Sequence, residues 1–369
     1  MWSINEIISS ILLKTKKVKT QTTITEEAFA QFKEKLSQTT AIPPILFGQE
    51  ERGIVSFIKK ETTKFNVNNI TRTSAYLEFY KRNKEIHWSF LAHMVSRNGG
   101  WNMTDIKGSL LNELLPSTKV DLFFEFLEKA NAFIFHDAYP QLLLYEHSKK
   151  TGRNLFHLLP FFSVSSFMKP IWELFLRENN SAFLTIALIL NEQYMIQTRL
   201  IEHSKYEVEV LDSSLFKAQE TFGFTDVLFP YKRRQKTELA GATVRGFANV
   251  TNRIYIGKSL YGILFHCIYN QAYEYAITTT HTGSRCDFWP QFFTDKKLTD
   301  SNKIYSPILT TVWPNVSHTY KTEDWFQSVE VMEQLKTYQI PSTYKKSKNY
   351  KSDLNKLRSI QSMKDKLSK

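Results

Sequence analysis

The sequence predicts a mainly α-helical protein: a multi-helix globular body with short extended or irregular connections in its C-terminal half. Glycine and proline, which most often end regular elements, number only 12 and 11 in 369 residues, so few and long elements are expected. Several segments place apolar residues at the helical period, whereas strand-like alternation is short. The 42% of apolar and 14% of aromatic residues suffice for a large core.

Residues 1–20 predict an amphipathic helix with a basic continuation. The apolar positions follow the helical period, and four lysines against Glu6 give the segment a charge of +3. Such a helix fits the surface of an anionic membrane. The alternative is an ordinary terminal helix that packs on the body, and both interpretations stay open.

Residues 21–205 predict a helical lobe. Asn69 or Thr71 and Ser181 are of the types that begin helices, Pro170 suits a first helical position, and Gly152 suits a helix end. The predicted helices run over residues 25–37, 50–64, 69–82, 85–97, 119–135, 141–150, 170–177 and 181–203, with a kink at 136–140.

Residues 206–340 predict a second, partly irregular helical lobe, which could equally form one domain with the first. Its predicted elements are strands over residues 207–210 and 226–231, an exposed basic run over 232–236, and helices over 251–276 and 325–338.

The net charge of +12 is concentrated at the two ends of the chain. From Pro341 onward, nine basic and two acidic residues give +7, and the lysine- and serine-rich composition of residues 341–369 predicts a flexible tail. With the +3 of residues 1–20, this leaves +2 for the body, so no basic groove is expected there. Only Tyr344 and Tyr350 interleave with the basic tail, which argues against single-stranded nucleic acid as its partner.

The sequence predicts a cytoplasmic location, with a peripheral contact to the membrane as the alternative. Its two cysteines, Cys267 and Cys286, offer neither a disulfide framework nor a CxxC pair. No signal peptide opens the chain. The longest apolar run, from Ala182 to Leu190, is far shorter than the roughly 20 residues that span a bilayer.

The segment from Glu85 to Gly108 carries the densest set of chemically capable side chains. On a helix, Glu85, Ser89, His93 and Arg97 are successive i, i+4 neighbours and form one polar stripe among apolar positions. Such a helix is expected to be buried. Its stripe must therefore find protein partners or line a cavity, because an unpaired buried polar group costs about 1–3 kcal/mol.

The end of this helix is predicted at Asn98 and Gly99, with Gly100 loosening the turn and Thr104 capping the next helix. The candidate ligand-binding residues are Arg72, Ser89, His93, Arg97, Asn98, Asn102, Asp105 and Lys107.

Two interpretations of this segment stay open. In the first, it lines a pocket in which His93 transfers a proton or makes polar contacts and Arg97 pairs with a carboxylate or phosphate. In the second, the same side chains form an internal hydrogen-bond network that joins two helices across the glycine turn. Structural ion-pair networks have the same composition as sites.

A polar loop over residues 278–288 holds the secondary candidates His281, Arg285 and Asp287. Cys286 beside His281 suggests a thiol nucleophile with Asp287 orienting the base. No papain-like or nucleophile-elbow context accompanies them, so a polar loop with its own side-chain turns is favoured.

Motifs that would name a reaction are absent from the sequence. There is no HExxH, GxGxxG or GxSxG pattern, and the nine histidines have no recognised metal spacing. Gly257-Lys258-Ser259 imitates the end of a P-loop, but Asn252 occupies the position of its first glycine. The sequence therefore names no catalytic residue, cofactor or metal, and it does not decide whether the protein is an enzyme.

The blocks NITRTSAYLEFYKRNKEIHWSFLAHMVSRNGGWNMTDIKG (Asn69 to Gly108) and HDAYPQLLLYE (His136 to Glu146) resemble the YppC-like family of uncharacterised bacterial proteins, a domain of unknown function. The resemblance covers roughly Thr40 to Tyr338 and leaves both ends outside. It implies a cytosolic bacterial protein and carries over no activity, cofactor or site residue.

Two functions remain as predictions. The first is binding of a small polar or anionic ligand in a helical pocket lined by residues 85–108. The second is a non-enzymatic adaptor that uses its basic ends on an anionic membrane surface or nucleic acid.

Overall fold

The computed structural model describes residues 18–37, 48–109, 117–201, 226–244, 246, 248–297 and 303–356. Within these ranges the predicted class is confirmed, because long helices dominate and the strands are few and short. No helix in the described ranges is both long enough and apolar enough to span a bilayer.

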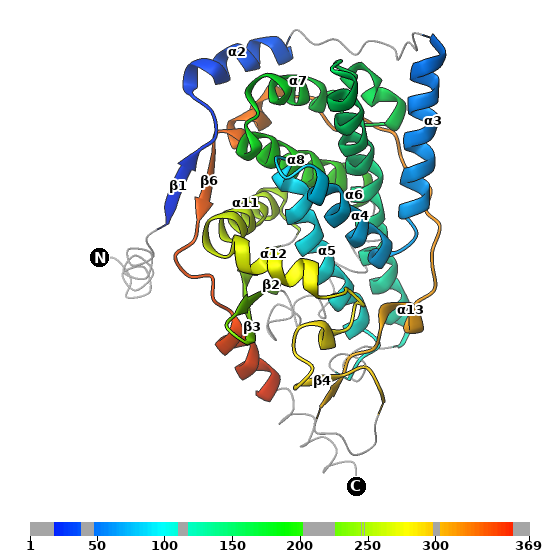
Figure 1. The fold of residues 1–369 in the computed structure, drawn as a ribbon, viewed down its shortest axis with the longest axis vertical. Helices are drawn as coiled ribbons and strands as arrows, with labels where there is room; N and C mark the ends of the chain where they lie inside the picture. The colour runs from blue at the N-terminus through cyan, green and yellow to red at the C-terminus, as the bar shows by residue number, and fades with distance from the viewer. Residues whose placement is uncertain are drawn as a thin grey trace, which may run out of the picture.

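Helix α5 (His87–Asp105) lies in the centre of the fold, between helices that come from both halves of the chain (Figure 1). The helices around it are α4 (Asn69–Arg82), α6 (Ser117–Thr151), α8 (Ser181–Ile196), α11 (Val250–Cys267) and α12 (Tyr269–Thr278). In Figure 1, α11 and α12 lie on one side of α5, and α4 and α6 lie on the other.

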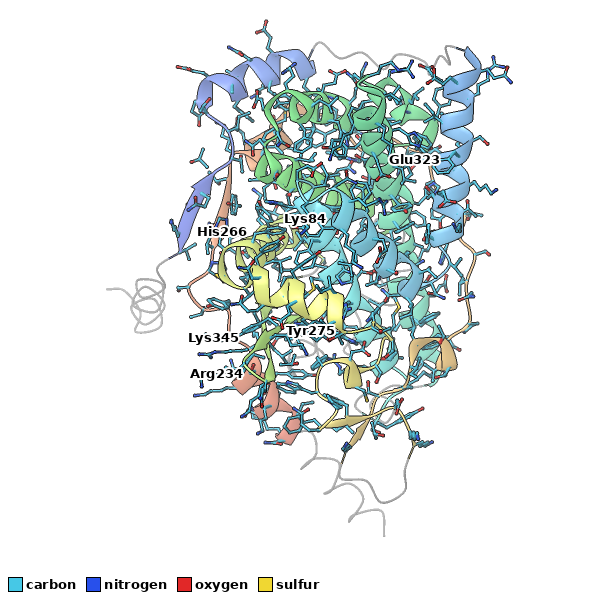
Figure 2. The ribbon with its side chains drawn as sticks, viewed as in Figure 1. Lys84, Arg234, His266, Tyr275, Glu323 and Lys345 are labelled. Atoms are coloured by element: carbon cyan, nitrogen blue, oxygen red, sulfur yellow. The ribbon has the colours of Figure 1, made fainter. Side chains whose placement is uncertain are left out.

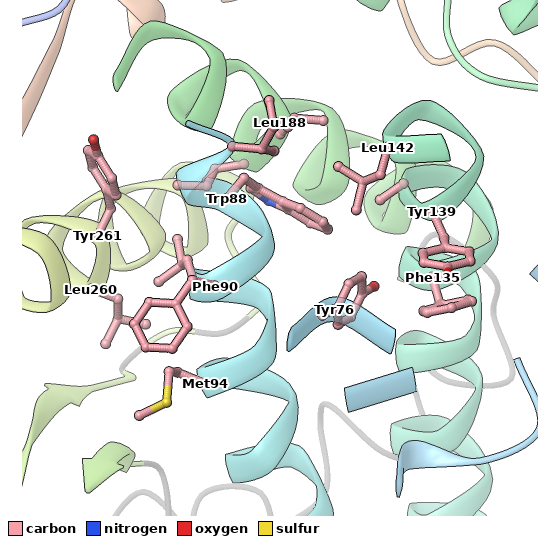
Figure 3. Close-up of a cluster of buried hydrophobic side chains, with 14 of the residues drawn as sticks. Tyr76, Trp88, Phe90, Met94, Phe135, Tyr139, Leu142, Leu188, Leu260 and Tyr261 are labelled. Atoms are coloured by element: carbon pink, nitrogen blue, oxygen red, sulfur yellow. The ribbon is translucent and has the colours of Figure 1, made fainter. Parts of the chain in front are cut away.

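Large apolar side chains fill the space around α5. Phe90 and Met94 project from the side of α5 that faces α11, whereas Trp88 projects from the other side toward α6 and α8 (Figure 3). All three are buried, and the ring of Tyr80 from α4 stacks on Phe90 with 5.0 Å between centroids. These contacts explain why α5 is buried: a central helix needs apolar residues on several sides.

Helix α8 is the most apolar helix of the body. It begins where Asn180 caps it, the Asn180 side chain accepting a hydrogen bond from the amide of Phe183 at 3.0 Å. Its side chains from Phe183 to Leu190 are buried. Glu192 is its only charged residue.

The strands form three two-stranded sheets at the edges of the helical body. They pair β1 (Lys19–Thr22) with β6 (Thr337–Ile340) antiparallel, β2 (Asp226–Arg233) with β3 (Lys236–Thr243) antiparallel, and β4 (Phe293–Thr294) with β5 (Ile304–Tyr305) parallel. The remaining elements are α2 (Glu26–Ser37), α3 (Gly48–Phe65), the 3₁₀ helix η1 (Phe156–Phe162), α7 (Met168–Glu178), the π-helical turn η2 (Gln197–Ile201), the 3₁₀ helix η4 (Arg285–Asp287), α13 (Leu309–Val312) and the 3₁₀ helix η5 (Val329–Leu335).

The helix predicted over residues 325–338 is wrong. Only the short η5 forms there, and the segment then becomes β6, whose backbone pairs with β1. Trp325 lies before η5 in non-helical chain, where its ring stacks on Tyr194 of α8 with 4.9 Å between centroids. Tertiary contacts of Trp325 and of the strand therefore override the local helical pattern.

The predictions for the two ends are corrected in part. Residues 1–17 lie outside the described ranges, but residues 19–20 begin β1 and do not continue a helix. Within the predicted tail, residues 347–356 are helical, with Tyr350 only 4% exposed and Leu354 only 2% exposed. Residues 357–369 and the strand predicted at 207–210 also lie outside the described ranges.

Two further helix predictions change in detail. Residues 251–276, predicted as one helix, are divided at Ile268 into α11 and α12. The two helices predicted on either side of residues 136–140 form the single helix α6, which contains Pro140.

Candidate functional site

Helix α5 continues through Gly99 and Gly100 to Asp105, so the turn predicted at the two glycines is wrong. Thr104 does not cap a second helix. Thr104 lies within α5, and its hydroxyl is 2.9 Å from the carbonyl oxygen of Trp101 and 2.6 Å from that of Gly283, to either of which it can donate.

Gly100 is needed for a close approach of two side chains to the helix. A Cβ at this position would lie 2.4 Å from Asn69 Oδ1 and 2.6 Å from His281 Nε2. The glycine therefore lets side chains of α4 and the 278–288 loop contact the backbone of α5. This close contact, and not a turn, explains why residue 100 is glycine.

Three residues of the predicted polar stripe, Ser89, His93 and Arg97, are covered by protein, whereas Glu85 lies in a turn before α5 and pairs with Lys149 at 2.5 Å. The three covered residues belong to what we call the packed face of α5, made of Ser89, His93, Ser96, Arg97, Gly100 and Thr104, all of them buried. The Ser89 hydroxyl donates to the carbonyl of Ile86 at 2.8 Å. His93 Nδ1 donates to the carbonyl of Thr73 at 2.8 Å, and His93 Nε2 accepts from Arg97 Nε at 3.1 Å.

Arg97 joins α5 to the end of α12. Its guanidinium donates to the carbonyls of Ala276 (3.3 Å) and Thr279 and lies over the ring of Tyr275, 5.1 Å from the centroid. Burial and then the charge of Arg97 lower the pKa of His93, which is consistent with its neutral donor–acceptor arrangement. Their contacts match the internal network that the sequence offered as its second interpretation.

The secondary candidates His281 and Asp287 belong to the same network. His281 Nε2 lies 2.9 Å from Asn69 Oδ1, and its Nδ1 lies 3.3 Å from Asp287 Oδ2. Asp287 also accepts from the indole of Trp101 at 3.2 Å. Although burial acts to raise it, hydrogen bonds from His281 and from residue 282 lower the pKa of Asp287.

The thiol-nucleophile interpretation of the loop gains no support. Burial raises the pKa of Cys286, which disfavours the thiolate that attacks substrates. Both ring nitrogens of the neighbouring His281 already face Asn69 and Asp287.

Asp105 and Arg285 form a buried ion pair. The guanidinium contacts both carboxylate oxygens at distances from 2.6 to 3.0 Å, and both side chains are 2–3% exposed. Arg285 Nη2 also lies 3.4 Å from Asn102 Oδ1. The pair joins the end of α5 to η4.

The other two candidates have different environments. Asn98 is buried, and its side-chain oxygen accepts from the amide of Leu228 in β2 at 3.0 Å. Lys107 is partly exposed, with its ammonium over the ring of Trp313 at 4.4 Å and 3.7 Å from Asp121.

The opposite face of α5 borders a cavity of about 290 Å³. The cavity lies between α5, α6, α8 and α11, next to β2. We call its side of α5 the cavity face, made of Trp88, Leu91, Ala92, Val95, Gly99 and Asn102. Three residues at the borders of this face, Ser96, Asn98 and Asp105, also contribute to the lining. At 100° per residue, the positions of the cavity face lie on the other side of the helix from the packed face.

Two arginines contribute to the cavity wall, and each has protein partners. Arg72 from α4 contacts Glu128 Oε2 at 2.5 Å and Asn66 Oδ1 at 3.1 Å. Arg253 from α11 donates to the side-chain oxygens of Gln193 at 2.9 Å and Gln197 at 2.7 Å.

Glu192 of α8 is the acidic group of the wall that has no ion pair in the described part of the chain. Its carboxylate accepts from the amide of Gln193 at 2.8 Å. Burial raises the pKa of Glu192 to about 7, while hydrogen bonds from Gln193 and Trp88 oppose the shift.

Tyr76 of α4 places a second unusual group at the cavity. Its side chain is 3% exposed, and its hydroxyl has no hydrogen-bond partner among the described residues. Burial and then the negative charge of Glu192 raise the pKa of Tyr76.

Neither Glu192 nor Tyr76 was among the candidates from sequence. A single carboxylate in the most apolar helix was an available signal for Glu192. Tyr76 had a weaker signal, since it shared a helix face with Arg72 at i, i+4. Their meeting with α5 depends on how α4 and α8 pack, which no local pattern encodes.

Comparison with known proteins gives a family and a relative. A family model described as "Protein of unknown function (DUF2515)" matches residues 64–358. The chain is 42% identical over 282 residues to "Uncharacterized protein YppC" of Bacillus subtilis (strain 168), an alignment that covers 75% of this chain and 85% of the relative. No solved structure matches the chain.

Proposed function

The chain belongs to the DUF2515 family of proteins of unknown function, and we propose that it binds a small ligand with an apolar body in the cavity beside α5. The observation that carries the proposal is a hydroxyl group, that of Tyr76, which is buried at the cavity without a partner among the described residues. A buried hydroxyl without a hydrogen bond costs free energy that a ligand can recover.

The lining favours a ligand that is largely apolar. Leu91, Ala92 and Val95 of the cavity face are joined by aromatic and aliphatic residues of α6 and α8. The volume of about 290 Å³ lies just below the range of about 300–1,000 Å³ for small-molecule sites, so the ligand should be small. A few polar groups in such a wall fix the orientation of the ligand.

The lining gives less support to the anionic ligand that the sequence suggested. A tightly bound anion needs cationic donors that are free to reach it. Arg72 donates to Glu128 and Asn66, and Arg253 donates to Gln193 and Gln197. His93 and Arg97 lie on the packed face and do not line the cavity.

The test uses three probes that share a phenylmethyl or phenyl body: benzyl alcohol, benzylamine and benzoate. Ligand-observed NMR should detect binding of at least one of them to the full-length protein. Ala92→Leu should abolish this binding because the larger side chain fills the cavity, and it should keep or raise the melting temperature, since filling a cavity commonly stabilises by about 0.5–2 kcal/mol.

The control is Ala28→Leu, at a half-buried alanine of α2 that does not line the cavity. It should leave probe binding unchanged. Failure of all three probes to bind, or equal binding to the Ala92→Leu protein, would contradict the proposal.

We also propose a second candidate function, attachment to an anionic membrane surface. One observation favours it: two basic segments far apart in sequence lie together. Lys345 pairs with Ala240 of β3, and Figure 2 shows Lys345 and Arg234 on the same edge of the molecule. The exposed basic residues of this edge are Arg233, Arg234, Lys236, Lys345, Lys348 and Lys351.

A membrane surface fits this edge better than single-stranded nucleic acid. Tyr350 is buried and Tyr344 is half-buried, so the two aromatic residues of the tail are not presented for stacking on bases. The fraction of protein that co-sediments with vesicles containing phosphatidylserine should fall as the salt concentration rises. It should also fall when Arg233, Arg234 and Lys236 are replaced by serine; equal binding by this variant, or stronger binding to single-stranded DNA, would contradict the candidate.

A further inference from the structure

We infer that the cavity selects a small organic cation, a protonated amine on an apolar body, whose ammonium group contacts the carboxylate of Glu192 and the hydroxyl of Tyr76. The inference rests on the proposed function, because it names the ligand class of the same cavity.

Glu192 differs from two other acidic groups near α5, which form ion pairs. Glu128 is paired with Arg72 at 2.5 Å, and Asp105 is paired with Arg285 at 2.6 Å. The partners of Glu192 are neutral, namely the Gln193 amide and the Trp88 indole. Arg253 acts on Glu192 through its positive charge. A bound ammonium group would add a charged hydrogen-bond donor directly to the carboxylate.

Tyr76 is the second group that a ligand can satisfy. This residue lines the cavity and is 3% exposed, and its buried hydroxyl lacks a partner in the described part of the protein. An ammonium group has three N–H donors. One donor can serve the Glu192 carboxylate and another the Tyr76 oxygen, so a single ligand group satisfies both.

A second carboxyl group, that of Asp137, lies behind the cavity wall and acts on Glu192 through its charge, although Asp137 does not line the cavity. Asp137 of α6 accepts from Gln141 at 2.8 Å and Asn191 at 2.5 Å, while its Oδ1 has no partner among the described residues. Its charge contributes to the raised pKa of Glu192, and burial raises the pKa of Asp137 to about 6. Two such carboxyl groups disfavour an anion and favour a cation.

The walls suit the rest of an amine ligand. Trp88 and Tyr76 present aromatic rings, and Phe123 and Phe126 of α6 also line the cavity. Aromatic faces attract cations, and the same rings bury a hydrocarbon body.

The experiment compares benzylamine with benzyl alcohol and benzoate, which differ mainly in charge. Isothermal titration of the full-length protein at pH 8 should give a dissociation constant for benzylamine on the order of tenfold lower than for benzyl alcohol, as expected for one charge-assisted hydrogen bond. Benzoate should bind weakest.

Glu192→Gln keeps the shape of the side chain and removes its charge. It should remove the preference for benzylamine over benzyl alcohol while binding of the alcohol persists. Glu274→Gln, at an exposed glutamate of α12, is the matched control and should leave the preference intact. Tyr76→Phe should weaken benzylamine by a smaller factor than Glu192→Gln does.

The pH dependence gives an independent readout. The groups facing Glu192 are Tyr76 and Arg72 from α4, Asp137 from α6 and Arg253 from α11. Because the pKa of Glu192 is about 7, the wild-type affinity for benzylamine should be on the order of tenfold higher at pH 8 than at pH 6. The Glu192→Gln protein should lose most of this dependence.

The outcomes separate the inference from the proposed function. Binding of benzyl alcohol or benzoate in the cavity without a preference for benzylamine overturns the inference and leaves the proposed function standing. A preference that survives in Glu192→Gln also overturns the inference. If no probe binds, both the proposed function and the inference are overturned.

Discussion

The two faces of α5 both carry polar residues, but the structure uses them differently. On the packed face, His93 and Arg97 are enclosed by α4 and the end of α12. Both ring nitrogens of His93 and the Nε and Nη2 atoms of Arg97 meet main-chain or side-chain partners. On the cavity face, Ala92, Val95 and Gly99 leave space that α6, α8 and α11 do not fill. One helix therefore holds the protein together on one side and borders a candidate binding site on the other.

The comparison shows that polar density in a sequence is a poor guide to a site. The dense stripe of α5 is a structural network, because most of its donors find an acceptor in the protein; Arg97 Nη1 is the exception among the described residues. The face with fewer polar residues borders the cavity. There the carboxylate of Glu192 has a neutral hydrogen-bond donor, and the hydroxyl of Tyr76 has no partner in the described part of the chain. An unmet polar group points to a ligand better than an abundance of polar groups does.

The largest expected effect is loss of the packed face through Arg97→Leu. This change leaves His93 Nε2 and the carbonyls of Ala276 and Thr279 without their donor. Because each buried unpaired group costs about 1–3 kcal/mol, the free energy of unfolding should fall by about 3–5 kcal/mol. Chemical denaturation followed by circular dichroism measures it.

Arg177→Leu is the control for the loss of an arginine, because Arg177 is exposed near the end of α7. It should change the free energy of unfolding by about 0.5 kcal/mol or less. If Arg97→Leu and Arg177→Leu lowered the free energy of unfolding by similar amounts, the contacts of the packed face would not stabilise the fold as expected.

The next effect concerns Glu192 and has the opposite sign. Its pKa is raised from 4.5 in the unfolded chain to about 7 in the folded protein. The folded state therefore binds the proton more tightly, and this group's contribution to stability falls as the pH rises from about 4.5 to 7. At pH 8, Glu192→Gln should be more stable than the wild type by up to about 3 kcal/mol.

Below pH 4.5 the carboxyl group is protonated in both states, so the advantage of Glu192→Gln should vanish there. Thermal or chemical unfolding of both proteins at pH 4 and pH 8 checks this. A difference that stays constant between the two pH values would show that the ionisation of Glu192 is not the cause.

Much of the fold could be predicted from local sequence. The helices of the first half and β2 follow from apolar periodicity. The predicted helix starts are shifted by one to three residues: Asn68 caps α4 in place of Asn69 or Thr71, Asn180 caps α8 in place of Ser181, and α7 begins at Met168, before Pro170. The larger errors occur where a distant segment decides the structure. β6 exists because β1 pairs with it, and residues 347–356 are held in place because Tyr350 packs against Trp289 with 5.6 Å between centroids.

The candidate site was predicted only in outline. The sequence pattern singled out the helix that forms α5 and posed the question as a cavity or a network. It could not decide, because the partners of α5 come from residues 276–287 for the packed face and from Glu192 and Arg253 for the cavity face. The double glycine predicts a turn, because no local pattern shows that the side chains of Asn69 and His281 pack against the backbone at Gly100.

The two glycines offer the finest comparison of the faces, because they are neighbours about 100° apart around the helix, one on each face. A Cβ at Gly100 would lie 2.4 Å from Asn69 Oδ1, in the packed network, whereas a Cβ at Gly99 would lie 3.3 Å from the Asn131 side chain, at the edge of the cavity. Alanine improves the helix by about 1 kcal/mol at either position. At Gly100 overpacking by about 1–3 kcal/mol opposes this gain, whereas at Gly99 the Asn131 amide has room to move. Gly100→Ala should therefore unfold about 1–3 kcal/mol more easily than Gly99→Ala in denaturant, and equal stabilities would mean that the two faces are packed alike.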